Sequence, residues 1–236
     1  MEYALRHEYP GICKDGVVSF GGNQRELDSR TLCHCGCGLV AALDLLRYFH
    51  LYDSAECSDI FSGIEKAHGL SLPLYRLCAQ RMRRSYVPIV YPFGTTGVAL
   101  AAGMNYCFQQ NRLPYTASWG VGEAELWREI AAMLQQDLPV ILSVGKGFPR
   151  FWEKRGVALG RRVGDTMRES TRIRAHFVTV VGMDKDWLRV SSWGREYYLS
   201  KEEFLHYRST ESLRFLCNIL LIRRHDSTGY DVNSWK

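Results

Sequence analysis

Residues 176–204 read HFVTVVGMDKDWLRVSSWGREYYLSKEEF, and this stretch contains two apolar runs joined by a short polar turn. The first run covers 176–184 and the second covers 187–193, with Asp-Lys-Asp between their apolar parts. Short runs rich in β-branched residues around a tight polar turn are typical of a β-hairpin. We therefore expect two antiparallel strands here.

The chain around this hairpin divides into a helical first half and a β-rich second half. Leu39, Leu43 and Leu46 recur at helical spacing and predict a helix over 38–52. The other helices are expected over 58–68, 73–84, 96–110, 122–136 and 201–207, and the other strands over 17–20, 138–145, 196–199 and 215–224. This segregation favours an α+β fold with helices packed on one side of a sheet.

The composition is that of a folded protein, since 46% of the 236 residues are apolar and 23% are charged. We expect one domain over 1–236, with its core in 17–224 and a polar tail. No apolar run approaches the roughly 18 residues of a membrane span. Charged residues such as Glu2 and Arg6 stand where a signal peptide has its apolar stretch. The expectation is a cytoplasmic protein that does not bind membranes.

One segment carries most of the net charge of +5. Residues 146–174 hold nine Lys/Arg and three Asp/Glu. A solvated loop is one interpretation, and a surface for an acidic ligand is the other. No recognised nucleic-acid motif accompanies the charge, so nucleic acid is not an expected partner. We expect a long irregular connection here, with Phe148 and Trp152 as candidates for a lid over a cleft.

The eight cysteines are expected to be free thiols. Those in apolar patterns are expected to be small core side chains, namely Cys78, Cys107 and Cys217. Another three are packed into Cys33-His34-Cys35-Gly36-Cys37. Such a cluster can bind a metal or act as a redox site, although its spacing is tighter than the usual Cys-x2-4-Cys of zinc sites.

Cys37 stands at the start of the first long helix, where the positive end of the helix dipole lowers a thiol pKa. A thiolate there can attack a carbonyl carbon, and its own backbone N–H can stabilise the oxyanion. His176 opens an apolar strand, so a rigid element would hold its ring as a catalytic base requires. The plain alternatives are a buried structural thiol and a strand histidine that only packs.

The order of these features resembles the papain-like cysteine peptidase superfamily, and within it the peptidase C39-like group. The gap from Cys37 to His176 is 139 residues, and papain enzymes have roughly 130–150. CGLVAALDLL, LQQDLPVILSVG and the hairpin beginning at His176 are similar to that group's cysteine helix, helix–turn–strand and histidine strand. The resemblance covers roughly residues 17–207.

The resemblance implies a papain-like fold and hydrolysis of a peptide or amide bond in a peptide or protein substrate, without a cofactor or metal. Cys37 corresponds to the nucleophile, His176 to the base, and Gln24 to the oxyanion donor. Alignment on the Trp-Gly after the hairpin puts Ser191 at the usual Asn/Asp position, where it gives no charge to an imidazolium. Cys35 is also followed by Gly, but Cys37 registers better with the family's helix.

Two departures keep other functions open. Ser191 in place of Asn or Asp fits a papain-like scaffold without catalysis that binds a peptide or protein partner. Gln24 lies 13 residues before Cys37, a longer separation than in papain, so the residues between them would have to loop out. The second alternative is a thiol-rich metal or redox site in the 33–37 cluster.

Overall fold

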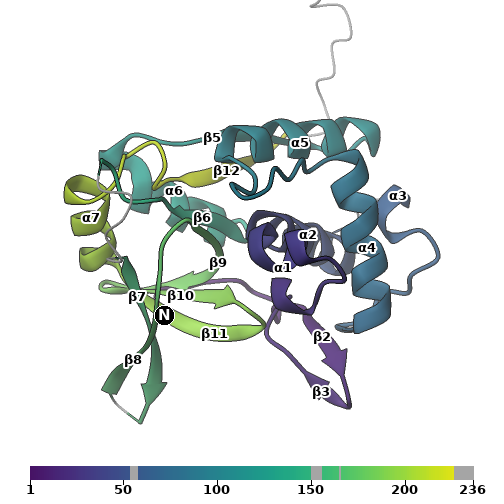
Figure 1. Ribbon diagram of the computed structural model, residues 1–236, viewed down its shortest axis with the longest axis horizontal. Coiled ribbons are helices and arrows are strands. Elements are labelled where there is room, and N and C mark those ends of the chain that lie inside the picture. The colour runs from purple at the N-terminus through teal and green to yellow at the C-terminus, as the bar shows by residue number, and fades with distance from the viewer. Residues whose placement is uncertain (54–57, 150–155, 165, 226–236) are drawn as a thin grey trace, which may run out of the picture.

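The computed structural model describes residues 1–53, 58–149, 156–164 and 166–225 (Figure 1). The fold is α+β, as the sequence predicts. The helices are α1 (Arg30–Cys35), α2 (Cys37–Tyr52), α3 (Ser58–Phe61), α4 (Leu72–Ser85), α5 (Gly97–Gln110), α6 (Leu126–Gln135) and α7 (Lys201–Thr210), with 3₁₀ turns η1 (Gln24–Glu26) and η2 (Glu123–Glu125). None of the described helices has the length and apolar character needed to cross a membrane.

The strands form one large sheet and one small sheet. The large sheet runs in the order β5 (Tyr115–Trp119), β12 (Ile219–Arg224), β6 (Val140–Val144), β9 (His176–Met183), β10 (Trp187–Ser192), β11 (Arg195–Ser200), β7 (Val157–Val163) and β8 (Thr166–Ile173), and β1 (Tyr3–Ala4) also pairs with β9. The small sheet contains β3 (Val17–Val18), β2 (Gly11–Lys14) and β4 (Gly69–Ser71). All described pairings in the large sheet are antiparallel.

Helix α2 is the centre of the core. It packs on β9 and against α4 and α5, and Figure 1 shows it among the helices beside the sheet. The face predicted to be apolar is buried, with Leu39, Leu43 and Leu46 fully enclosed. The opposite face is buried too, so α2 is a core helix rather than a surface one. Each enclosed leucine contributes roughly 1.5–3 kcal/mol through burial.

The hairpin that the sequence predicts is formed by β9 and β10. Its turn is closed by the Asp184 carboxylate, which accepts hydrogen bonds from the N–H groups of Asp186 and Trp187. The next turn, from β10 to β11, contains Trp193 at φ 48° and Gly194 at φ 72°. Two successive positive φ angles match the right-handed twist of a two-residue hairpin loop. This turn fixes Trp193 beside the first residue of β9.

The expectation of an irregular connection over 146–174 is wrong. Strands β7 and β8 form a hairpin in this segment and extend the sheet beyond β11. Most of β8 is exposed, so its sequence lacks the apolar alternation that marks a half-buried strand. Phe148 is half-exposed and its N–H donates to the Glu211 carbonyl, whereas Trp152 lies outside the described residues.

Other expected elements differ in extent. The helix expected over 58–68 is shortened to α3. The sequence predicts neither the helix α1 nor the strands β1, β2, β4 and β5. Three of the cysteines are fully buried free thiols, as predicted, namely Cys78, Cys107 and Cys217. The tail after residue 225 lies outside the described residues.

Candidate functional site

The candidate site lies where the start of α2 meets the start of β9. Gly36 separates α1 from α2, and a side chain there would meet the Leu32 carbonyl oxygen at 2.4 Å. Cys37 therefore begins α2 immediately after a tight turn. A cavity of about 20 Å³ is lined by Gln24, Cys37 and His176, among others. Three parts of the chain that the sequence analysis singled out thus meet at one point.

His176 is a buried, neutral base. Its side chain is enclosed between Ser192, whose Oγ lies 2.8 Å from Nε2, and Trp193, whose ring stacks on the imidazole at 4.5 Å. Burial lowers the pKa of His176 to about 3, and the nearby positive charge of Arg25 adds to this. The Arg25 guanidinium itself lies over the Trp193 ring at 5.2 Å. The imidazole is therefore uncharged at neutral pH.

Cys37 is a neutral thiol, contrary to the expectation from the helix dipole alone. Burial raises the pKa of Cys37, and backbone hydrogen bonding, first of all from Phe177, offsets only part of this effect. Among the hydrogen bonds of the described residues, none joins Cys37 to His176. The resting pair is therefore thiol and imidazole rather than thiolate and imidazolium.

Gln24 reaches the site because the segment between it and Cys37 folds compactly. Residues 30–35 of that segment form α1, whose first turn is capped by the Ser29 hydroxyl on the Leu32 N–H. The Gln24 amide donates to the carbonyls of Cys33 and His34 at 3.0 and 3.3 Å. The long separation along the chain is thus bridged by a helix, and the last turn of that helix fixes the Gln24 side chain.

The residue that contacts the imidazole is Ser192, whereas the sequence analysis assigned this role to Ser191. The Ser191 hydroxyl donates to the Phe20 carbonyl at 2.8 Å. The alignment on Trp193 and Gly194 is therefore off by one residue, because these two residues form the turn itself and Ser192 directly precedes it. This partner is again a hydroxyl, and among the described residues no carboxylate is hydrogen-bonded to the imidazole.

Asp44 also lines the cavity, and the sequence analysis missed it. Its carboxylate accepts hydrogen bonds from the Gly22 N–H at 2.7 Å and the Tyr75 hydroxyl at 2.9 Å. Burial raises the pKa of Asp44 to about 6. The available signal was its place seven residues after Cys37, on the same face of a mostly apolar helix. Asp44 thereby anchors the segment that leads to Gln24.

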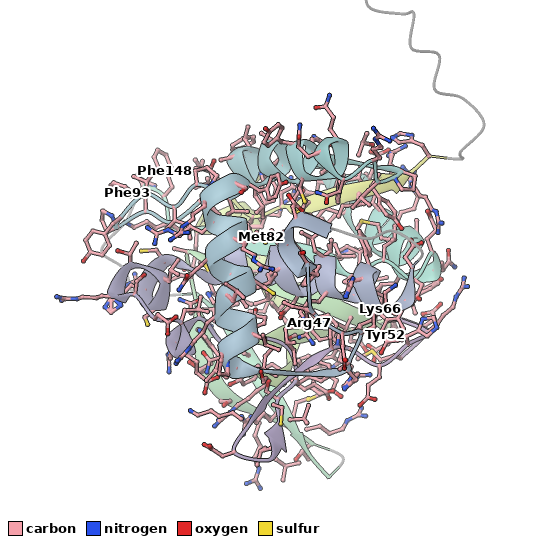
Figure 2. The ribbon with its side chains drawn as sticks, turned by 90° about the vertical axis from the view of Figure 1, so that its right-hand side faces the viewer. Arg47, Tyr52, Lys66, Met82, Phe93 and Phe148 are labelled. Atoms are coloured by element: carbon pink, nitrogen blue, oxygen red, sulfur yellow. The ribbon has the colours of Figure 1, made fainter. Side chains whose placement is uncertain are left out.

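Two larger pockets flank Cys37 and His176. One, of about 460 Å³, is lined by Cys37 and by apolar side chains of three segments, including Phe93, Trp119 and Phe215. Figure 2 shows Phe93 pointing away from the body of the molecule, where it is 81% exposed. The other pocket, of about 470 Å³, is lined by His176 and by three arginines. The site therefore has an aromatic side and a basic side.

The cysteine cluster is spread apart by α1. Cys33 Sγ donates to the Leu27 carbonyl at 3.1 Å, and Cys35 Sγ donates to the Pro92 carbonyl at 3.3 Å. Within the described residues, no three His, Cys, Asp or Glu side chains converge as a metal site would require. Cys37 shares the small cavity with His176, whereas Cys35 does not line it.

No protein-family model matches the chain, and neither a curated protein nor a solved structure is significantly similar to it.

Proposed function

We propose that this protein is a thiol hydrolase of the papain-like type, which cleaves a peptide or amide bond. The observation that carries the proposal is the meeting of Gln24, Cys37 and His176 around one cavity. These residues supply an oxyanion donor, a nucleophile and a base. They come from a 3₁₀ turn, a helix start and a strand start, which are rigid elements suited to positioning reacting groups.

The reaction begins when the His176 imidazole accepts the thiol proton of Cys37. The Cys37 sulfur then forms a bond to the carbonyl carbon of the substrate, and the Cys37 N–H stabilises the oxyanion. The Gln24 amide adds a second donor when one of its N–H groups leaves the carbonyl of His34, the longer of its two hydrogen bonds. His176 returns the proton to the leaving amine as the C–N bond breaks. Water, deprotonated by the same imidazole, then attacks the acyl-enzyme and releases the acid. Transfer of the acyl group to another acceptor would use the same residues.

Ser192 orients the imidazole in this mechanism. With Nε2 bonded to Ser192 Oγ, Nδ1 is the ring nitrogen left for the Cys37 thiol. A hydroxyl fixes the ring but stabilises an imidazolium less than a carboxylate does. The thiolate and imidazolium therefore form during the reaction, as the Cys37 proton passes to His176, and are not present at rest.

The second candidate is a papain-like scaffold that binds a peptide without cleaving it. The observation in its favour is the neutral resting pair, with the pKa of Cys37 raised and that of His176 lowered to about 3. The two flanking pockets would then hold a peptide segment with no chemical step. For a metal or redox function, the described side chains offer no comparable support.

The test is alkylation of the full-length protein with iodoacetamide from pH 4 to 9, with peptide mass mapping of each cysteine. If His176 is the base for Cys37, Cys37 reacts faster than the half-buried Cys33 below pH 8, and His176→Gln slows Cys37 by at least about 10-fold while Cys33 is unchanged. General-base assistance is typically worth 10²–10⁴-fold, so this threshold is conservative.

Equal Cys37 rates in the wild type and in His176→Gln, with an ordinary thiol profile near pH 8.5, would overturn the hydrolase proposal and favour the inactive scaffold. Joint protection of Cys33, Cys35 and Cys37 that is released by a chelator would favour the metal site instead. Circular dichroism of His176→Gln checks that the variant is folded.

A further inference from the structure

The pocket beside His176 is lined by three arginines. Arg25 enters it from η1, and Arg172 and Arg174 enter it from the end of β8. Of the described residues that line it, none is Asp or Glu. Guanidinium groups bind carboxylates with strong, charge-assisted hydrogen bonds, so a pocket whose described lining holds three arginines and no carboxylate suits an anionic group.

The segment 146–174, which the sequence marks as basic, contributes only part of its charge to this pocket. Arg161 and Arg162 lie over the rings of Tyr197 and Tyr198 and do not line it. Arg172 pairs with Glu169 and Glu203, and these pairs hold the guanidinium in place and offset its charge. The positive charge next to the site is therefore positioned by neighbouring side chains.

Arg25 is also held in a defined position. Its guanidinium lies over the Trp193 ring, and the His176 imidazole stacks on the same ring. An arginine ordered by stacking loses less side-chain entropy when it binds a ligand. The pocket thus contains a cation fixed close to the catalytic imidazole.

We propose that this pocket binds a carboxylate side chain of the substrate, on the leaving-group side of the scissile bond. The side is assigned from the lining. His176, which protonates the leaving amine, lines the basic pocket, whereas Cys37, which takes the acyl group, lines the aromatic pocket. The assignment to the leaving-group side depends on the proposed function, whereas the binding of a carboxylate does not.

Such a ligand also supplies what the resting site lacks. The positive charge of Arg25 contributes to the lowered pKa of His176. A carboxylate bound against Arg25 reduces that contribution, since an opposite charge nearby favours the protonated imidazole. An acidic substrate would therefore favour the imidazolium that the reaction requires, in a site where Ser192 provides no charge.

The experiment measures binding without turnover, using the full-length Cys37→Ala variant on an array of random peptides at low salt. Peptides with Asp or Glu at one position are expected to bind at least about 10-fold more tightly than the Asn or Gln counterparts, the size of one charge-assisted hydrogen bond. Adding Arg25→Gln and Arg174→Gln abolishes this preference. The matched control, Arg161→Gln with Arg162→Gln, removes the same charge from the same protein and keeps the preference.

Three results would overturn the proposal: no preference for acidic over amide side chains, a preference that survives in the Arg25/Arg174 variant, or no peptide binding at all. The outcome is separable from that of the hydrolase proposal. A preference for acidic peptides together with an unreactive Cys37 would contradict only the hydrolase proposal. A Cys37 that is activated by His176, together with no preference for acidic peptides, would contradict only the proposal of a carboxylate subsite.

Discussion

Asp44 and His176 are two buried ionisable side chains that line the same small cavity, and they are held in different ways. Asp44 accepts two hydrogen bonds, from a backbone N–H and a tyrosine hydroxyl, and Arg47 on the same helix favours its charged form. In the part of the chain that the structure describes, the His176 ring has one hydrogen-bond partner, the Ser192 hydroxyl, and Arg25 disfavours its charged form. Asp44 on α2 is therefore held by hydrogen bonds in its charged form. His176 on β9 is a base whose proton affinity depends on what binds beside it.

Removal of the Asp44 carboxylate has the largest expected effect on stability. Asp44→Ala leaves the Gly22 N–H and the Tyr75 hydroxyl buried without their acceptor, and unsatisfied buried groups cost about 1–3 kcal/mol each. We expect the free energy of unfolding in urea to fall by about 3–5 kcal/mol. Asp44→Asn, which keeps one oxygen acceptor, should lose about half as much. A loss below about 1 kcal/mol for Asp44→Ala would show that Asp44 does not anchor the Gly22 segment to α2.

A carboxylate in place of the Ser192 hydroxyl gives the imidazole a negatively charged partner. Ser192→Asp places a carboxylate on Nε2 of His176, and an opposite charge at this distance raises a histidine pKa by about 1–3 units. NMR titration of the His176 ring measures the shift. Ser191→Asp is the matched control, because the Ser191 side chain contacts the Phe20 carbonyl and not the imidazole. Equal shifts in both variants would contradict the assignment of Ser192 as the partner.

The third prediction uses the opposite pH dependence of the two groups. The pKa of folded Asp44, about 6, lies above its usual 3.8, so this group makes stability fall as pH rises from about 4 to 6. The pKa of folded His176, about 3, lies below its usual 6.5, so this group makes stability fall as pH drops from about 6.5 toward 3. In the wild type the two effects oppose each other between pH 4 and 6.

A variant that lacks one of the two titrating side chains shows the pH dependence of stability that the other side chain causes. Asp44→Asn should lose about 1–2 kcal/mol more stability than the wild type between pH 6 and 4, whereas His176→Gln should gain about as much over the same interval. Urea unfolding at several pH values measures both slopes. Parallel profiles for the wild type and both variants would show that neither group titrates differently in the folded and unfolded protein.

The sequence predicts the parts of the site that depend on local pattern. The start of α2 at Cys37 follows from helical periodicity, and the start of β9 at His176 follows from an apolar run. These patterns reflect the backbone geometry of single elements, so they can be read without the fold. The α+β class is predictable for the same reason, since helices and strands are segregated along the chain.

The parts that were missed depend on contacts between distant segments. Whether Ser191 or Ser192 meets the imidazole is decided by one residue of register at the turn after β10, which sequence spacing alone does not resolve. The role of Asp44 requires the return of the Gly22 segment to α2. The β7–β8 hairpin is mostly exposed, so burial imposes little pattern on its sequence.

The smallest expected effect separates the two adjacent serines. Ser191→Ala and Ser192→Ala each delete one buried hydrogen bond of 2.8 Å, and each should lower the free energy of unfolding by about 1 kcal/mol. Their effects on Cys37 should differ, because only Ser192 orients the base. We expect Ser192→Ala to slow alkylation of Cys37 several-fold at pH 7, and Ser191→Ala to leave it unchanged. If both variants slow Cys37 equally, the serines act through the stability of β10, and the imidazole is positioned by its stacking on Trp193 instead.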